Sequence, residues 1–392
     1  MEGPMNTLEK KLLSSVDKHL PLLTIIAVSI LSVIIRFSLR HIVSLDVSNF
    51  LLPWFNIISQ NGLYEQVGDY NLLYQFLIWI MTKLPFEPLY SYKILSCLGD
   101  YLLAILAALL VREIDNNNQT WNSIWAYTAI LLCPICFINS AAWAQCDALF
   151  TSFAVLGLYL LMKEQYNRAL IALGISFAFK LHAVFILPVF LFVYYSRRHF
   201  SVLRFILVPV AMLSLSLPLV FWGRNPLETI SVYFNQISSY PNMALNYPSF
   251  WTLLCNTDDI TQYVNLRFTA VLFTFSILAF IMVYWVQKNY STAGKNLLIM
   301  AFILCYTCVL FLPSMHERYG FLYEMIAIIL AVLIPKTFPL CLGLLLMSLR
   351  TYGSYLFEIE VNLVYLSILN LAIYVGYLHL LNPELELQEN QT

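Results

Sequence analysis

The chain of 392 residues is 60% hydrophobic and only 11% charged, and its mean hydropathy is +0.74. Because a soluble domain carries about 25% charged residues, this composition excludes a protein covered by a water-facing surface. The net charge of −1 and the absence of a basic cluster also exclude nucleic acid as an expected partner. The sequence predicts an all-α polytopic membrane protein that is surrounded by membrane lipid.

Apolar segments of the length needed to cross a bilayer follow one another along the chain. Residues 1–20 are expected to form a cytoplasmic segment, and the first helix after them is expected to stay uncleaved because no small-residue cleavage site follows it. Residues 382–392 are expected to form a cytoplasmic tail. Twelve spans are predicted, over residues 21–36, 88–111, 120–139, 147–162, 168–181, 183–196, 204–222, 268–286, 296–314, 318–335, 338–354 and 362–381.

Two long loops are expected on the outer side, over residues 38–87 and 223–267. Placing the amino terminus in the cytoplasm puts twelve of the 21 Lys and Arg residues on the inner side, as the positive-inside rule requires. In the first loop, residues 49–59 and 72–84 are apolar but too short to span, so they predict helices at the membrane surface. Nothing in the sequence divides the chain, and residues 1–392 are expected to form a single membrane domain.

Ionisable residues gather at the predicted outer ends of the spans. Each of them is costly to place at membrane depth and is therefore a functional candidate. Structural explanations remain open as well, among them Asp46 as a solvated loop carboxylate or a helix cap, Asp69 as a turn former and Lys180 as a cation that reaches the interface. The candidates are Asp46, Asp69, Asp147, Lys180, His182, His316, Glu317, Arg318 and Arg350.

These residue types suit one kind of chemistry. A carboxylate at the mouth of a membrane cavity can act as a general base towards a hydroxyl group, and cations nearby can neutralise a phosphate leaving group. Arginine in particular binds phosphate through a forked pair of hydrogen bonds. The pattern therefore predicts group transfer from a lipid-phosphate carrier.

Several motifs in the same order resemble those of a known superfamily. The first loop has Asp46, Phe50-Leu51 and Pro53-Trp54, followed by a Gly68-Asp-Tyr-Asn turn that ends at Tyr74. The motifs Trp143-Ala-Gln145-Cys-Asp147, Phe179-Lys180 with Phe185 and Pro188, and Met315-His-Glu-Arg-Tyr319 follow later. Over about residues 20–380 the chain resembles the GT-C glycosyltransferases that use lipid-phosphate sugars, and most closely the bacterial relatives of the second mannosyltransferase of GPI-anchor synthesis.

The resemblance implies a GT-C-like bundle of about 12 transmembrane helices whose long first outer loop carries interfacial helices. It also implies an inverting hexosyltransferase in which Asp46 is the general base. Arg318 and Arg350, with Lys180 or His316, would stabilise the carrier phosphate. The other expected substrate-binding residues are Asp69, Tyr70, Trp143, Gln145, Asp147, His182 and Glu317. No cofactor is expected, and a divalent metal is not favoured, because Val47 and Ser48 follow Asp46 where relatives often have a second acidic residue.

The expected donor is a polyprenyl-phosphate-linked mannose, glucose or galactose, and the expected acceptor is a glycan, a glycolipid or a wall polymer. A lipid-linked saccharide flippase and a polysaccharide exporter or polymerase remain as alternatives. A transporter would need functional charge on the inner half of its helices too, whereas the deep polar residues here lie on the outer half. The favoured location is a plasma membrane with both termini cytoplasmic and the active site outside; an endoplasmic-reticulum membrane with a lumenal site has the same topology.

Overall fold

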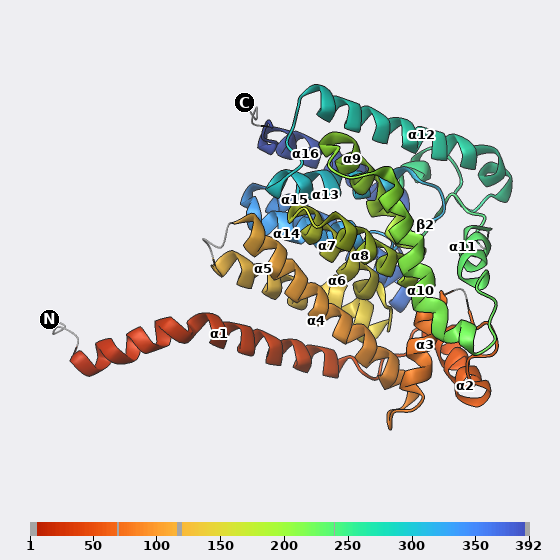
Figure 1. Cartoon of the computed structure of the whole chain (residues 1–392), viewed down its shortest axis with the longest axis horizontal. Helices are drawn as coiled ribbons and strands as arrows, with labels where there is room; N and C mark the ends of the chain where they lie inside the picture. The colour runs from red at the N-terminus through yellow and green to blue at the C-terminus, as the bar shows by residue number, and fades with distance from the viewer. Residues whose placement is uncertain (1–5, 69, 116–119, 239, 389–392) are drawn as a thin grey trace.

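The computed structural model describes residues 6–68, 70–115, 120–238 and 240–388, and these form a bundle of helices (Figure 1). The first half of the chain contains α1 (Thr7–Ser38), η1 (Val47–Leu51), α2 (Leu52–Asn61), α3 (Leu72–Met81), α4 (Pro88–Ile114), α5 (Thr120–Leu132), α6 (Pro134–Phe137), η2 (Ile138–Ala142), α7 (Asp147–Met162), α8 (Tyr166–Phe179), η3 (Leu181–Ile186) and α9 (Leu187–Arg197). The second half contains η4 (Val202–Ile206), α10 (Leu207–Phe221), α11 (Glu228–Ser238), η5 (Phe250–Leu253), α12 (Ile260–Gln287), α13 (Gly294–Phe311), α14 (Phe321–Leu333), η6 (Pro335–Thr337), α15 (Phe338–Phe357), α16 (Leu363–Leu381) and η7 (Asn382–Glu384).

Two very short strands join distant loops. Strands β1 (Ala244–Leu245) and β2 (Met315–His316) pair in parallel, with Ala244 opposite Met315. This pairing holds the second long loop against the Met315-His-Glu-Arg-Tyr319 motif.

The architecture is that of an all-α polytopic membrane protein. Within the described residues, seven helices are long and apolar enough to cross a membrane, and the number becomes eight if α5 and the segment Pro134–Ala142, bent by 45°, form one span. Four further predicted spans coincide with apolar helices of only 10–17 residues, so the count of twelve stays a prediction. These shorter segments are Asp147–Met162, Tyr166–Phe179, Leu181–Arg197 and Phe321–Leu333.

The most deeply buried helix is α13. Every residue of α13 from Asn296 to Phe311 is buried, as expected for a helix that is apolar on all sides. In contrast, α1 and α12 lie on opposite sides of the bundle and expose large apolar side chains such as Ile34 and Phe280 (Figure 1). Apolar surface of this extent marks an interaction face, which in a protein of this composition is the face towards lipid.

The loops that carry the sequence motifs meet at one end of the bundle. Helices α2, α3 and α11 and strand β2 lie together at this end, and both termini lie towards the other (Figure 1). The buried guanidinium of Arg224 joins the two long loops, because it donates to the carbonyl oxygens of Leu63 at 3.1 Å and Glu65 at 2.6 Å. Helix α3 presents a buried face that includes Leu72 and Tyr74 and packs against α8 and α10. Residues 72–81 of the predicted segment 72–84 are thus helical, and this helix is part of the packed bundle.

Candidate active site

The chain that follows α1 is held in place by buried donors. Lys93 of α4 donates through its Nζ to the carbonyl oxygens of Leu39 at 3.0 Å and Ile42 at 2.7 Å. The hydroxyl of Ser44 accepts from the backbone N–H of Val47 at 3.3 Å and thereby takes the capping role. Asp46 directly precedes η1, but its side chain makes no capping hydrogen bond. The carboxylate is therefore free for another use, and the cap explanation for Asp46 is wrong.

The Asp46 carboxylate accepts four hydrogen bonds from three different parts of the chain. Its Oδ2 accepts from Trp143 Nε1 at 2.9 Å, from Gln145 Nε2 at 2.8 Å and from Arg318 Nη1 at 2.8 Å. Its Oδ1 accepts from the hydroxyl of Tyr355 at 2.5 Å. Burial acts to raise the pKa of Asp46, but the charge of Arg318 and the hydrogen bond from Tyr355 outweigh it, so the pKa lies below its usual value. Asp46 is therefore an ionised carboxylate near neutral pH.

A break in the predicted helix over residues 120–139 places Trp143 and Gln145. That prediction is wrong in detail, because α5 ends at Leu132, Pro134 begins α6, and the π-helical turn η2 carries the chain on to Ala142. Proline cannot continue the hydrogen-bond ladder of a helix, and the segments on either side bend by 45°. Ala144 then adopts a φ of +62°, a conformation more natural for glycine.

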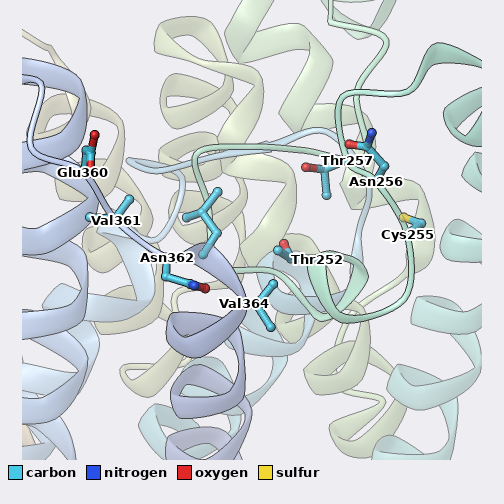
Figure 2. A pocket seen from close by; sticks show the side chains of 9 residues that line it. Thr252, Cys255, Asn256, Thr257, Glu360, Val361, Asn362 and Val364 are labelled. Atoms are coloured by element: carbon cyan, nitrogen blue, oxygen red, sulfur yellow. The ribbon is translucent and has the colours of Figure 1, made fainter.

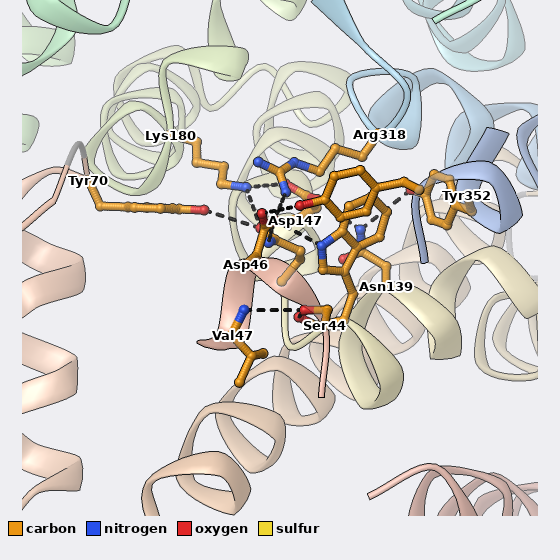
Figure 3. Close-up of polar contacts among 12 residues, drawn as sticks. Ser44, Asp46, Val47, Tyr70, Asn139, Asp147, Lys180, Arg318 and Tyr352 are labelled. Atoms are coloured by element: carbon orange, nitrogen blue, oxygen red, sulfur yellow. Dashed lines mark hydrogen bonds and ion pairs between the residues drawn. The ribbon is translucent and has the colours of Figure 1, made fainter. Parts of the chain in front are cut away.

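Asp147 and Lys180 form a buried ion pair behind Asp46. Lys180 Nζ lies 2.5 Å from Asp147 Oδ1, and both side chains are almost fully buried. Asn139 donates to the other oxygen of Asp147 at 2.9 Å. Figure 3 shows Lys180, Arg318 and Tyr70 converging on this region, where Tyr70 donates to Gln145 Oε1 at 3.2 Å. The sequence prediction that these residues meet is therefore correct as geometry; their roles towards a substrate stay predictions.

Asp46 and neighbouring side chains line a cavity of about 340 Å³. Its charged and polar lining contains a carboxylate, two cations and two imidazoles beside aromatic rings. The Tyr319 ring stands between the imidazoles, with ring centroids 3.8 Å from His182 and 4.8 Å from His316. The lining residues are Asp46, Phe50, Leu51, Trp54, Gly68, Tyr70, Gln145, Lys180, His182, Tyr240, His316, Arg318 and Tyr319.

Buried nitrogen atoms of the cavity residues are left without a hydrogen-bond partner in the described part of the chain. They are Nδ1 of His182, Nε2 of His316 and Nε of Arg318. Burial and the neighbouring Arg318 lower the pKa of His316 to about 3, so this imidazole is neutral and has one donor and one acceptor nitrogen. Because unpaired buried polar groups are costly, these atoms favour a polar ligand with an anionic part.

Asp69 lies outside the described residues. Four of the other predicted residues do not line this cavity: Trp143, Asp147, Glu317 and Arg350. Arg350 does not line the cavity; its guanidinium donates to the carbonyl oxygen of Glu360 at 3.2 Å, so the structure does not bring it to Asp46. Glu317 is buried beside the cavity without lining it, and burial raises its pKa to about 7.

Two residues that matter to the geometry were missed from the sequence. Tyr355 bonds Asp46 and stacks on Trp143, with ring centroids 4.7 Å apart, and Tyr352 packs edge-on against the same ring at 5.2 Å. Tyr352 and Tyr355 are three residues apart and so share a face of α15. That spacing is the signal present in the sequence, and neither tyrosine carries a charge as Arg350 does.

A second, more open cavity lies on another part of the molecule (Figure 2). Its volume is about 630 Å³, and it is formed by the end of η5 with the following loop and by the connection between α15 and α16. Its polar side chains are neutral except for Glu360, and it includes no residue of the Asp46 cavity. The lining residues are Thr252, Cys255, Asn256, Thr257, Glu360, Val361, Asn362, Leu363 and Val364.

A metal site is not formed by the side chains that the structure describes. Among residues 6–68, 70–115, 120–238 and 240–388, no three His, Cys, Asp or Glu side chains come together in a group that could hold a metal ion. Asp46 instead has Arg318 as its cationic partner, at 2.8 Å. The expectation of a metal-free site stays a prediction.

Comparison with known proteins gives one match. The family model described as alpha-(1->6)-mannopyranosyltransferase, N-terminal domain, matches residues 70–196. No curated protein matches the chain. The matched part contains Tyr70, Trp143, Gln145, Asp147 and Lys180, and the nearer likeness to relatives of the second GPI mannosyltransferase stays a prediction. The predicted kinship with sugar transferases is confirmed, because residues 70–196 match the model of a mannosyltransferase family.

Proposed function

We propose that this protein is an inverting GT-C-type mannosyltransferase of the plasma membrane. It takes a hexose, foremost mannose, from a polyprenyl-phosphate carrier and transfers it to a hydroxyl group of a glycan, glycolipid or wall polymer at the outer face. The observation that carries the proposal is the Asp46 carboxylate in a cavity that also holds Arg318, Lys180 and two histidines. The match of residues 70–196 to a mannosyltransferase family supports mannose as the sugar.

The proposed reaction needs only groups that the site and its substrates supply. Asp46 accepts the proton of the acceptor hydroxyl while the oxygen attacks the anomeric carbon of the sugar. The bond between that carbon and the phosphate oxygen breaks, and the electron pair leaves with the carrier phosphate. Arg318, with Lys180 behind it, stabilises the negative charge that develops on this phosphate. After the reaction the proton of the acceptor hydroxyl lies on Asp46, and the negative charge that Asp46 carried is balanced by the additional negative charge on the carrier phosphate.

Transfer from radiolabelled polyprenyl-phosphate sugars tests the proposal directly. Membranes containing the native protein are expected to transfer mannose in preference to glucose or galactose, with or without chelator. Asp46→Asn is expected to reduce transfer by about 10² to 10⁴, the usual contribution of a general base. Asp258→Asn is the matched control, because Asp258 is an exposed aspartate in the second long loop.

Each result has a distinct meaning. Normal transfer by a folded Asp46→Asn protein would remove Asp46 as the base. Release of sugar from none of the three donors would refute the transferase and favour a lipid-linked saccharide flippase. Loss of transfer in chelator would refute the metal-free mechanism alone.

A further inference from the structure

The hydrogen bonds that Asp46 accepts are crowded on one of its two oxygens. Each carboxylate oxygen offers about two lone-pair sites. Trp143, Gln145 and Arg318 all donate to Oδ2, so this oxygen holds one donor more than it has lone pairs, whereas Tyr355 alone donates to Oδ1. An adjacent cation stabilises the charged form of a carboxylate and so weakens it as a base. Loss of the 2.8 Å contact with Arg318 would therefore relieve Oδ2 and make Asp46 a stronger base towards a hydroxyl group.

Three of the four donors are fixed by their surroundings. The Trp143 ring is fully buried, and the Tyr355 ring stacks on it. Gln145 is also buried, and its Oε1 accepts from the Tyr70 hydroxyl at 3.2 Å and from Lys180 Nζ at 3.5 Å. Moving any of these donors would break packing or other hydrogen bonds.

Arg318 is held much less firmly. In the described part of the chain its guanidinium makes one hydrogen bond, from Nη1 to Asp46, and it lies 5.4 Å from the centre of the Trp143 ring. Its Nε is buried without a partner. A guanidinium has five N–H donors in a fork that fits phosphate, and Arg318 lines the cavity. It therefore has the most to gain from an anionic ligand.

We propose that the phosphate of the lipid-linked donor takes Arg318 away from Asp46, so that binding of the donor turns a neutralised carboxylate into an active base. This inference rests on the proposed transferase function and adds to it a coupling between the donor phosphate and the base. Before the donor binds, Arg318 neutralises Asp46 and weakens it as a base. Afterwards Tyr355, Trp143 and Gln145 still orient the carboxylate.

The movement of charge during the reaction agrees with this exchange. The bound donor is a phosphate diester with one negative charge, and its departure leaves a monoester with additional charge. Asp46 becomes neutral as it takes the proton. The cation is therefore needed less at Asp46 and more at the phosphate as the bond breaks, and the same guanidinium serves both positions in turn.

Binding of a polyprenyl monophosphate to the full-length protein in detergent micelles tests the exchange without an acceptor. If Asp46 competes for Arg318, then Asp46→Asn is expected to tighten phosphate binding by about tenfold to a hundredfold, the range of a charged hydrogen bond. In the Arg318→Gln background the same change should alter affinity less than about twofold, because there is no shared cation left to compete for. Asp258→Asn should have no effect in either background.

One result would overturn the exchange: Asp46→Asn increases the affinity for phosphate equally in the native and Arg318→Gln backgrounds. The increase would then come from the loss of direct electrostatic repulsion between Asp46 and the phosphate, without any part played by Arg318. If Arg318→Gln does not fold, Arg318→Lys keeps the charge without the fork and should reduce the coupling. The transfer assay separates the two proposals. Transfer by the native protein without this coupling in phosphate binding would overturn the exchange and leave the transferase intact, whereas no phosphate binding and no transfer would overturn both.

Discussion

Replacing Lys180 by methionine distinguishes a structural cation from a substrate-binding one. Methionine keeps most of the length of the side chain and removes its charge. Lys180 Nζ lies 2.5 Å from Asp147 Oδ1, and the two side chains are only 3% and 2% exposed. Removal of Lys180 leaves the Asp147 charge buried, with Asn139 as its one remaining side-chain donor among the described residues. Loss of one member of a buried pair costs about 3–5 kcal/mol, so the unfolding equilibrium should shift by a hundredfold to several thousandfold.

Unfolding of the purified protein in mixed SDS and detergent micelles would measure this free energy. A thiol-reactive dye can follow unfolding, because buried free cysteines such as Cys133, Cys305 and Cys308 become accessible only when the bundle opens. The double replacement Lys180→Met/Asp147→Leu should recover much of the loss, because it leaves no unpaired charge. The matched control is Lys163→Met, which breaks the exposed Lys163–Glu113 pair and should change stability little.

Equal stability of the Lys180→Met and Lys163→Met proteins would refute this reasoning. Additive losses in the double variant would refute it as well, since a coupled pair cannot give additive losses. In either case Lys180 would be a cation held ready for a ligand rather than one that secures Asp147. The stability result therefore decides how the activity of Lys180 variants should be interpreted.

Three further predictions concern the first loop, pH and metal. Gly68→Ala should abolish sugar transfer, because Gly68 has a φ of +66° and a Cβ there would lie 2.3 Å from the Trp54 ring. Gly62→Ala is the control for backbone strain alone, because Gly62 has a φ of +70° but a Cβ there would meet no atom closer than 3.8 Å. Burial raises the pKa of Glu317 to about 7, so the folded state binds the proton of Glu317 more tightly than the unfolded state, and stability should fall as pH rises from about 4.5 to about 7. Thermal unfolding of Glu317→Gln should lack that part of the decline. An identical decline in the variant would contradict the raised pKa of Glu317. Prolonged dialysis against chelator should leave the rate of transfer unchanged, and recovery of a lost rate on adding Mg²⁺ or Mn²⁺ would contradict it.

The long membrane helices were accessible from the sequence because apolar length is a direct requirement of the bilayer. The predicted spans 88–111 and 268–286 correspond to α4 and α12. The predicted span 120–139 is a bent pair of helices rather than one continuous helix, because hydropathy does not register a bend. Pro134 in its interior was the warning, and only the folded chain shows that the break delivers Trp143 to Asp46.

The charged members of the site could be predicted, whereas their partners could not. Asp46 and Arg318 were candidates because an ionisable residue at membrane depth requires a reason. Tyr355 gives no such signal, because a tyrosine in an apolar helix is most often a packing residue. Arg350 gave the signal and proved misleading, since a cation at a helix end can satisfy a loop carbonyl, here that of Glu360. Charged residues in the sequence therefore identify the end of the bundle at which the site lies, whereas packing in the folded chain decides which residues belong to the site.

The residues around Asp46 come from inside and outside the segment that matches the mannosyltransferase family. Residues 70–196 supply Trp143, Gln145 and Lys180. Asp46 precedes that segment and Arg318 follows it, so the 2.8 Å contact between them joins two distant parts of the chain. A further buried ion pair, Arg36 with Asp100 at 2.8 Å, fixes α1 to α4 near η2 through the hydroxyl of Ser140. The matched segment is therefore a framework whose chemistry depends on the flanking helices, and changes in α1 or α15 can alter the site without touching the segment that carries the family likeness.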